Sequence, residues 1–437
     1  MIFWTLTKPT EDRGRHLGHG RSRPDYFWKA TILTDAAKSS IKTAPRRISE
    51  AKLFLFSMAC AVAVANGYYI HPLIAPIGDD FGVAGHLLGL VPAFNQIALA
   101  LGILLLLPLG DHINNRKLVT TFVAGQFCAL LAMATAQDFR LFLAASSLLG
   151  FATITPYLLP AYVTKRVRPD RIGHVTGILT AGITVGLLGS RAGAGILGHY
   201  WGWRSAYWVG TALTLALLII LPLIMEKDEK LRDDGDAQES YRALIASLWP
   251  IIKTMPDVLL AGILQALSFG FFLALWLGIG LHITSAEMGY GVDIVGYLAL
   301  LAGTNIFIAP WSGRLADRIG PEKARMLFAI TQLIGAILLA FAGDNLWMLV
   351  LPILFSNFGG ASMDVANRTI LFGRAPEIRT RLMTVYIVIM FVGGGLASWL
   401  GTSAYAYGGW DAIVVISIIF AILIMALSIG AMRYRVR

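Results

Sequence analysis

The sequence is short of charged residues and of cysteine, and each shortage excludes a class of protein. Charged residues make up 14% of the 437 residues, whereas a soluble globular chain carries about 25%. The two cysteines, Cys60 and Cys128, both lie inside apolar runs, which excludes a disulfide framework and a cysteine metal site. Hydrophobic residues account for 56% of the chain, so lipid is predicted to be its main solvent.

The formal net charge of +10 does not predict a nucleic-acid partner. Basic residues are scattered between apolar runs and form no single stripe with interleaved aromatic side chains. The sequence contains no GxSxG elbow, no HExxH pair and no phosphate-binding Gly-Lys motif, so no enzyme and no cofactor are expected. A sensor is disfavoured, because neither the first 50 residues nor the 226–242 segment is long enough for a folded signalling domain.

Twelve apolar segments have the length of a membrane-crossing helix. A helix needs about 20 apolar residues to cross a hydrocarbon core about 30 Å thick. Runs of this length, bounded by charges, glycine or proline, predict spans at 51–76, 86–109, 117–136, 139–163, 172–199, 203–225, 256–281, 290–313, 322–341, 345–372, 379–404 and 410–432. The chain is therefore predicted to be an all-α protein of a lipid bilayer.

The distribution of lysine and arginine predicts the orientation of these spans. The short loops on one side, together with the C-terminal end, hold sixteen Lys and Arg residues, whereas the loops on the other side hold Arg140 and Arg204. Because basic residues accumulate in cytoplasmic loops, both termini are predicted to be cytoplasmic. The expected location is the cell membrane, inner or plasma, with multiple passes.

Polar segments flank and join the spans. Residues 1–50 carry ten Lys and Arg residues and are predicted to be a disordered basic cytoplasmic tail. A wrongly assigned start codon and attraction to anionic lipid headgroups remain alternatives for this segment. Residues 433–437 are a short basic tail. Residues 226–255 are predicted to be a cytoplasmic linker, in which 243–253 has the apolar spacing of an interfacial helix.

An internal repeat divides the spans into two halves. Asp111 in Leu-Gly-Asp corresponds to Asp317 in Leu-Ala-Asp, and Trp203 corresponds to Trp410, at shifts of 206 and 207 positions. Each match falls at the same place among the spans. The repeat predicts two pseudo-symmetric six-helix bundles, 51–225 and 256–432, related by an axis along the membrane normal.

The segments around the two aspartates resemble a known family. GRLADRIGPEKAR, residues 313–325, resembles the signature loop of the major facilitator superfamily, and PLGDHINNRK, residues 108–117, resembles its first-half copy. The first copy departs from the pattern at Leu107, His112 and Asn114, where glycine, arginine and glycine are expected. The PLGD motif is similar to the one in bacterial twelve-span drug:proton antiporters and solute exporters. The resemblance implies the major facilitator fold and a transporter.

The resemblance also implies that both loops latch the outward-facing arrangement. From the residues alone, a carboxylate at the end of a helix can accept hydrogen bonds from the N-terminus of a neighbouring helix. The alternative is that both acids stay hydrated and balance nearby arginines. The gating candidates are Asp111, Arg116, Gly313, Arg314, Asp317, Arg318 and Gly320.

Span five combines a glycine stripe with a deep charge. Gly182, Gly186, Gly189 and Gly193 fall on one stripe about 60° wide, against which another helix can approach closely. The stripe resembles the glycine-rich fifth helix of antiporters in the superfamily, although Ser190 stands where that pattern has proline. Arg191 lies on the opposite face. Because a lipid-facing arginine is costly, Arg191 is predicted either to face a wet cavity as a substrate or counter-ion site, or to reach the outer surface or backbone carbonyls.

Asp364 is the second deep charge, on a polar face of span ten shared with Asn357, Gly360 and Asn367. Two interpretations stay open for it: a proton carrier, or a local ion pair with Arg368 one turn away. His71 and His282 lie near the outer ends of spans one and seven, where each is either a coupling group or an interfacial residue. The remaining substrate-binding or coupling candidates inside the spans are Asn66, Tyr69, Asn95, Gln96, Tyr157, Gln265, Trp276, Asn305 and Tyr386, with helix-to-helix hydrogen bonding as the alternative.

These features predict a secondary active transporter of a small solute that works by alternating access. Proton-coupled export is the first hypothesis, with the proton gradient as its energy source. An uptake symporter or facilitator for an anionic metabolite, anchored on Arg191, is the alternative. The sequence determines neither the substrate nor an oligomeric partner.

Overall fold

The computed structural model describes residues 48–226, 241–301, 303, 305–373 and 378–436. The side chains of residues 111, 112, 305–307, 309 and 434–436 also lie outside the description. The predicted tail 1–50 therefore falls almost wholly outside the described residues, as does much of the predicted linker 226–255. All regular elements described below are helices.

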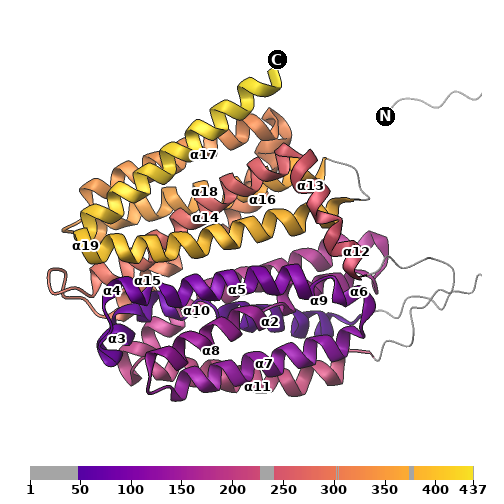
Figure 1. Ribbon diagram of the computed structural model, residues 1–437, viewed down its shortest axis with the longest axis horizontal. Coiled ribbons are helices and arrows are strands. Elements are labelled where there is room, and N and C mark those ends of the chain that lie inside the picture. Colours follow the sequence, from indigo (N-terminus) through magenta and orange to yellow (C-terminus); the bar gives the residue numbers. More distant parts are fainter. Residues whose placement is uncertain (1–47, 227–240, 302, 304, 374–377, 437) are drawn as a thin grey trace, which may run out of the picture. The chain divides into compact units, whose positions relative to one another are not determined.

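The first half of the chain forms one bundle of helices, drawn from indigo to pink in Figure 1. Its elements are α2 (Glu50–Ala65), α3 (Ile70–Phe81), α4 (Gly85–Leu88), α5 (Leu90–Leu106), α6 (Leu109–His112), α7 (Asn115–Thr135), α8 (Phe139–Ala152), α9 (Thr155–Thr164), α10 (Ile172–Trp201) and α11 (Arg204–Ile224).

The second half forms the other bundle, and α5 and the first stretch of α19 lie side by side at the boundary (Figure 1). Two short helices, α12 (Tyr241–Ala246) and α13 (Leu248–Thr254), precede it. The bundle itself comprises α14 (Pro256–Ile283), α15 (Val292–Leu301), α16 (Asn305–Ile319), α17 (Pro321–Leu338), α18 (Val350–Phe372) and α19 (Arg379–Val436).

The helix count agrees with the sequence pattern. Ten helical segments in the described part of the chain are long and apolar enough to cross a membrane. Predicted spans eleven and twelve form the single element α19, whose helical geometry is interrupted at Gly408 and Gly409. Predicted span eight corresponds to α15 and α16. When α19 is counted as two spans and α15 with α16 as one, the fold is consistent with the predicted twelve.

Two spans of the first bundle are broken in the middle, and local chemistry explains both breaks. Pro156 stands in the first turn of α9, where its missing N–H removes no hydrogen bond from the new helix but prevents α8 from continuing. The turn between α2 and α3 is held by Asn66, whose Nδ2 donates to Thr214 Oγ1 at 3.0 Å and whose Oδ1 accepts from the Tyr69 hydroxyl at 3.2 Å. These bonds satisfy polar groups that lipid would leave unpaired.

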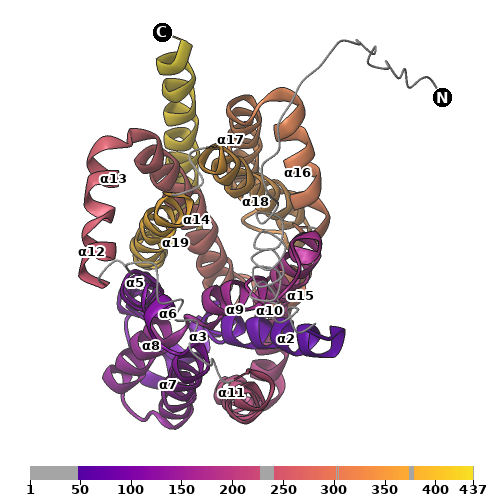
Figure 2. The same cartoon turned by 90° about the vertical axis from the view of Figure 1, so that its right-hand side faces the viewer.

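The segment between the bundles packs against both of them. Leu248 and Ile251 of α13 join an apolar cluster that contains Leu99 and Ile103 of α5 and residues of α19. The Tyr241 hydroxyl of α12 donates to the Leu105 carbonyl at 2.8 Å. Figure 2 shows α12 and α13 next to α5 and the first stretch of α19. The apolar face predicted for 243–253 is therefore buried in part against protein.

Candidate functional site

A central cavity of ≈ 240 Å³ lies between the two bundles and contains most of the polar face predicted for span ten. The first bundle contributes two residues, Tyr68 and Leu187, and the second bundle contributes the rest. The second-bundle residues are Gln265, Ser268, Phe269 and Phe272 of α14, Asn357, Gly360, Ala361, Asp364 and Arg368 of α18, and Met390 and Phe391 of α19.

The charged group in this cavity is an ion pair within α18. Arg368 Nε donates to both carboxylate oxygens of Asp364, at 2.9 and 2.8 Å, and the Tyr386 hydroxyl donates to Asp364 Oδ1 at 2.6 Å. The Asp364 and Arg368 side chains are 31% and 34% exposed. Their pairing is therefore the arrangement that the one-turn spacing predicts, and the carboxylate remains accessible from the cavity.

The neutral amides and hydroxyl of Gln265, Ser268 and Asn357 share the cavity wall with apolar side chains. Two of them are hydrogen-bonded by residues outside the lining: Asn367 Nδ2 donates to Gln265 Oε1 at 3.4 Å, and Gln332 Nε2 donates to Ser268 Oγ at 2.8 Å. Asn357 Nδ2 is buried without a hydrogen-bond partner among the described residues. Gln332 was not a sequence candidate. Gln332 is an amide inside an apolar span, as Gln265 is, and this pattern in the sequence could have identified it.

One of the two sequence hypotheses places Arg191 against a wet cavity. In the structure Arg191 is fully buried instead. Its Nε donates to His71 Nδ1 at 3.0 Å. The guanidinium carbon lies 5.4, 4.6 and 5.1 Å from the ring centroids of Tyr68, Phe272 and Trp276. Arg191 therefore sits in an aromatic cage directly behind Tyr68 and Phe272, which line the central cavity.

Several other candidates hold helices of the first bundle together and lie away from the cavity lining. Asn66 and Tyr69 contact α11, where Tyr69 packs edge-to-face on Tyr207 with centroids 5.9 Å apart. Asn95 Nδ2 donates to the Ser146 carbonyl of α8 at 2.8 Å. Gln96 is buried, and its side chain hydrogen-bonds Tyr68. The side chain of Asn305 lies outside the described residues.

A second cavity, of ≈ 320 Å³, lies at the end of the bundles next to α12 and α13. Tyr157, which packs edge-to-face on Phe391 of the central cavity, also lines this linker-end cavity. The other polar lining residues are Asn115, Tyr162, Lys165, Thr380, Arg381 and Thr384. Tyr157 therefore lines the linker-end cavity, and Phe391, the ring that it contacts, lines the central cavity.

The gating candidates lie at the same end of the chain's helices, which we call the Asp317 end. Asp317 and Arg318 are exposed in the last turns of α16, and the described residues give Asp317 no ion-pair partner. Arg314 Nε donates to the Pro310 carbonyl at 3.3 Å, and Gly320 adopts φ +87°, which requires glycine. The Asp111 side chain lies outside the described residues, so the first-half latch is not observable.

Two further gating candidates can be placed from their surroundings. The Arg116 backbone N–H is capped by Asn114 Oδ1 at 2.9 Å, at the start of α7. A Cβ on Gly313 would meet Val365 of α18 at 3.9 Å, which is ordinary van der Waals contact.

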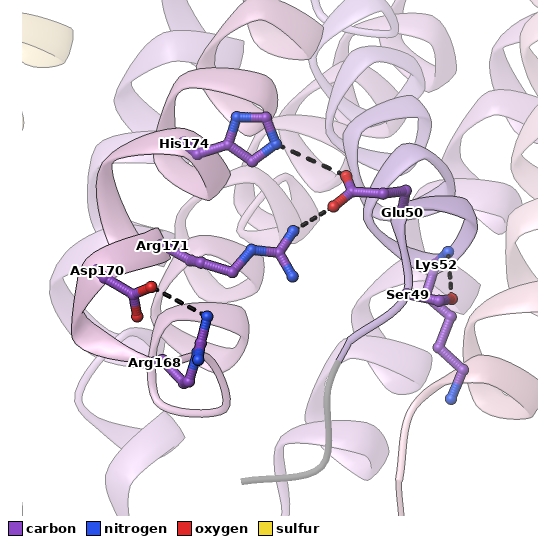
Figure 3. Close-up of polar contacts among 7 residues, drawn as sticks. All are labelled: Ser49, Glu50, Lys52, Arg168, Asp170, Arg171 and His174. Carbon is purple, nitrogen blue, oxygen red and sulfur yellow. Dashed lines mark hydrogen bonds and ion pairs between the residues drawn. The ribbon is translucent and has the colours of Figure 1, made fainter.

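At this end, the starts of α2 and α10 are joined by a small charged cluster (Figure 3). Glu50, in the first turn of α2, forms an ion pair with Arg171 and lies 3.6 Å from His174 Nε2. The Glu50 side chain is 65% exposed, so this pairing contributes little stability.

At the opposite end, which we call the His199 end, the bundles are in close contact. A Cβ on Gly195 of α10 would lie 2.7 Å from the Val292 carbonyl oxygen and 3.0 Å from Gly296 Cα of α15. His199 Nδ1 lies 3.2 Å from Asp293 Oδ1, across the same boundary. Small residues let the two backbones approach, so the path between the bundles is closed here.

The glycine stripe of α10 is used only in part. Cβ atoms on Gly182 and Gly186 would clash with backbone atoms of Ser57 and Ala61, so α2 packs directly on these two glycines. Cβ atoms on Gly189 and Gly193 would meet none of the described residues within 4 Å. The prediction of one continuous packing stripe is therefore wrong beyond Gly186, because the second close approach of α10 uses Gly195 on a different face.

His282 belongs to the second bundle's packing. Its Nε2 lies 2.7 Å from the Gly343 carbonyl oxygen, and its ring stacks on Trp410 with centroids 4.6 Å apart. His71, in contrast, is drawn into the Arg191 cage. Among the described residues, no group of three or more His, Cys, Asp or Glu side chains could hold a metal ion.

Sequence relatives of this chain are named as transporters. It is 28% identical to a probable transporter of Streptomyces coelicolor, SCO4007, over 91% of each chain. It is 25% identical to an uncharacterized transporter of Escherichia coli O157:H7, YgaY, over 83% of this chain and 91% of the relative. It is 24% identical to the multidrug resistance protein MdtG of Serratia proteamaculans, over 86% and 92%.

The fold has close counterparts among solved structures. The crystal structure of a nucleoside transporter, NupG, superposes with a TM-score of 0.66 at 15% identity and covers 87% of this chain and 98% of its own. Residues 55–345 match the Major Facilitator Superfamily. The match extends over more than half of the chain and includes nearly all of the first bundle, α14 to α17 of the second bundle and the sequence pattern at 313–325. The protein is a multi-pass membrane transporter, not an enzyme, and it belongs to the Major Facilitator Superfamily.

Proposed function

We propose that this transporter is a proton-coupled exporter of a small solute in the inner membrane, with both termini in the cytoplasm. The observation that carries the proposal is the Asp364 carboxylate, which is about one-third exposed in a cavity between the two bundles and is held by one arginine and one tyrosine hydroxyl. Such a carboxylate can exchange its partners for a proton or a solute. Competition between the two for one acid couples their movements in opposite directions.

Alternating access follows from the difference between the two ends. The His199 end is closed by the α10–α15 contact, whereas the linker-end cavity lies at the Asp317 end. With the predicted orientation, this conformation faces the cytoplasm. Opening the His199 end requires α10 and α15 to separate as the bundles rock about the central cavity.

Relatives named as multidrug resistance proteins favour export over uptake. The cavity lining agrees with a partly apolar solute, because it combines Phe269, Phe272 and Phe391 with neutral amides and hydroxyls. An uptake symporter is the alternative, and the direction of solute flux relative to the proton gradient separates the two.

The test uses the purified full chain in liposomes that enclose a pH-sensitive dye. A panel of cationic dyes, nucleosides, sugars and organic acids is added outside under an imposed pH gradient. An exporter releases protons in exchange for its solute, so one member of the panel should collapse the gradient. Movement of the solute in the same direction as the protons would contradict export.

Asp364→Asn identifies the coupling group. The variant should still exchange solute without a gradient but should lose gradient-driven transport by about tenfold or more, because the neutral amide cannot carry a proton. Asp411→Asn is the control, since Asp411 is exposed on the other side of the Gly408–Gly409 turn. Gradient-driven transport that survives in Asp364→Asn would contradict the proposed role of this carboxylate.

A further inference from the structure

A buried cation beside the central cavity has no acidic partner within the described part of the chain. Arg191 is 0% exposed, and none of the described carboxylates forms an ion pair with it. Burial of an unpaired charge is costly, and more so within a bilayer. Cation–π contacts with Tyr68, Phe272 and Trp276 offset part of that cost. These aromatic faces, however, accept no conventional hydrogen bonds from the N–H groups of the guanidinium.

Three hydrogen-bond donors in this cluster are unused. Arg191 Nη1 and Nη2 are buried and have no hydrogen-bond partner among the residues that the structure describes. His71 Nδ1 accepts from Arg191 Nε, so the neutral ring carries its hydrogen on Nε2, which is also buried and unpartnered. A cation with only a packing role would be expected to have its donors satisfied, as buried polar groups generally are.

The cluster lies against the solute cavity and across the boundary between the bundles. Tyr68 and Phe272 line the cavity, and their ring centroids also lie 5.4 and 4.6 Å from the guanidinium carbon of Arg191. Leu187, one helical turn before Arg191 on α10, also lines the cavity. Arg191 and His71 belong to the first bundle, whereas Phe272 and Trp276 belong to α14 of the second.

We propose that Arg191 and His71 form an anion subsite of the transport path, which binds a carboxylate or phosphate group of the solute. This inference rests on the proposed transport function and names the chemical class of its solute. A guanidinium fork matches the geometry of a carboxylate or phosphate, and His71 Nε2 supplies a further donor. Arg368 already neutralises Asp364, so Arg191 leaves the cavity region with a net positive charge that favours an anion.

The aromatic rings make the subsite dependent on conformation. In the present arrangement Phe272 and Trp276 of α14 cover the guanidinium, together with Tyr68. When the bundles separate at the His199 end, α14 moves away from α10 and uncovers the donors. The anion subsite is therefore available in the conformation that is open at the His199 end and is shielded in the one described here.

Binding to the detergent-solubilised full chain tests this inference without any proton gradient. Benzoate and phenylphosphonate serve as anionic probes, and benzamide serves as the neutral probe of matched shape. Calorimetric titration and thermal unfolding should show saturable binding of both anions and much weaker binding of benzamide. Arg191→Gln should weaken benzoate binding about tenfold or more, the scale of losing a charged, bidentate partner.

Further variants separate charge from geometry and from misfolding. Arg191→Lys keeps the charge but loses the fork, so it should bind benzoate with an intermediate affinity. His71→Gln should weaken phenylphosphonate binding by a smaller factor. Arg166→Gln is the control, because Arg166 also lies over a tyrosine ring, at 3.8 Å, but at the Asp317 end. It should bind both anions as the wild type does.

The outcomes that overturn the inference are distinct from a failure of the proposed function. Equal binding of benzamide and benzoate, unchanged benzoate binding by Arg191→Gln and Arg191→Lys, or no saturable anion binding at millimolar concentrations would each remove the subsite. Binding of chloride without binding of benzoate or phenylphosphonate would assign the subsite to an inorganic ion and also overturn the proposal. Loss of proton coupling alone leaves these binding results unchanged.

Discussion

The two ends of the bundle boundary differ in how the halves meet. At the His199 end, glycines 195 and 296 let α10 and α15 approach at backbone distance, and His199 faces Asp293 across the boundary. At the Asp317 end, a cavity of ≈ 320 Å³ lies between the bundles, and Asp317 has no ion-pair partner among the described residues. A single conformation thus has a close contact between the bundles at one end and a cavity between them at the other.

This difference shows why a latch motif need not be formed in a given structure. A contact that stabilises one conformation must be absent from another if it is to shift the equilibrium between them. An exposed Asp317 is what the predicted latch of the opposite conformation requires, and the latch itself stays a prediction. Four experiments can break or sharpen this comparison.

Bridging the closed end should have the largest effect. In a Cys60→Ser, Cys128→Ser background, His199→Cys and Asp293→Cys are linked with a short bis-thiosulfonate reagent, which replaces the 3.2 Å side-chain contact with a covalent one. Solute counterflow in liposomes should stop and should recover on reduction, because the bundles can no longer separate at this end.

The single variant Asp293→Cys, treated with the same reagent, is the control and should keep its activity. Full counterflow in the bridged pair would show that the His199 end does not open during transport.

Filling the close approach should have the next largest effect, on stability. Gly195→Leu places a side chain where Val292 O and Gly296 Cα already lie within 2.7 and 3.0 Å, so thermal unfolding should show destabilisation of about 1–3 kcal/mol. Gly193→Leu is the matched control, two residues earlier, where a Cβ meets none of the described residues within 4 Å. Similar unfolding temperatures for the two variants would mean that the crossing is not tightly packed.

Neutralising the acid of the His199–Asp293 contact across the boundary should have a smaller effect. Asp293→Asn should cost about 0.2–1 kcal/mol, because the His199 side chain is 42% exposed and the pair is partly screened. Asp80→Asn disrupts an ion pair within the first bundle, Arg204–Asp80 at 2.7 Å, whose acid is more exposed than Asp293, 42% against 15%. Both variants should unfold similarly, but only Asp293→Asn should change the counterflow rate. A rate change in both would argue against a gate at this pair.

Neutralising Asp317 should have the smallest effect on stability. Asp317→Asn should unfold within about 0.5 kcal/mol of the wild type, because the Asp317 side chain is exposed and has no ion-pair partner among the described residues. Counterflow should nevertheless slow if Asp317 holds the opposite conformation. A clear loss of thermal stability would mean that the acid already has a partner that the present conformation does not show.

The fold followed from the sequence because its signals are long and local. Apolar runs of about 20 residues, broken by Pro, Gly or charge, place most helix ends within a few residues of the observed ones. The ion pair of Asp364 and Arg368 was also open to prediction, since residues four apart share a helix face. The first latch, at Asp111, stays a prediction.

The site was harder to predict because it depends on rotations and on neighbours from distant helices. Tyr69 was a candidate, but Tyr68 lines the cavity, because the break between α2 and α3 turns the two side chains to opposite neighbours. The environment of Arg191 is set by Phe272 and Trp276, about eighty residues later. No pattern within span five could reveal that these rings would cover it.

The packing of α13 has a consequence for building this transporter from two polypeptides. Leu248 and Ile251 pack with α5 of one bundle and α19 of the other. A cut placed between Met225 and Tyr241 leaves α13 on the second fragment, where its contacts with α5 can help the two co-expressed halves to associate correctly. A cut between Thr254 and Pro256 would leave the same helix on the first fragment, facing a half to which it is no longer tethered.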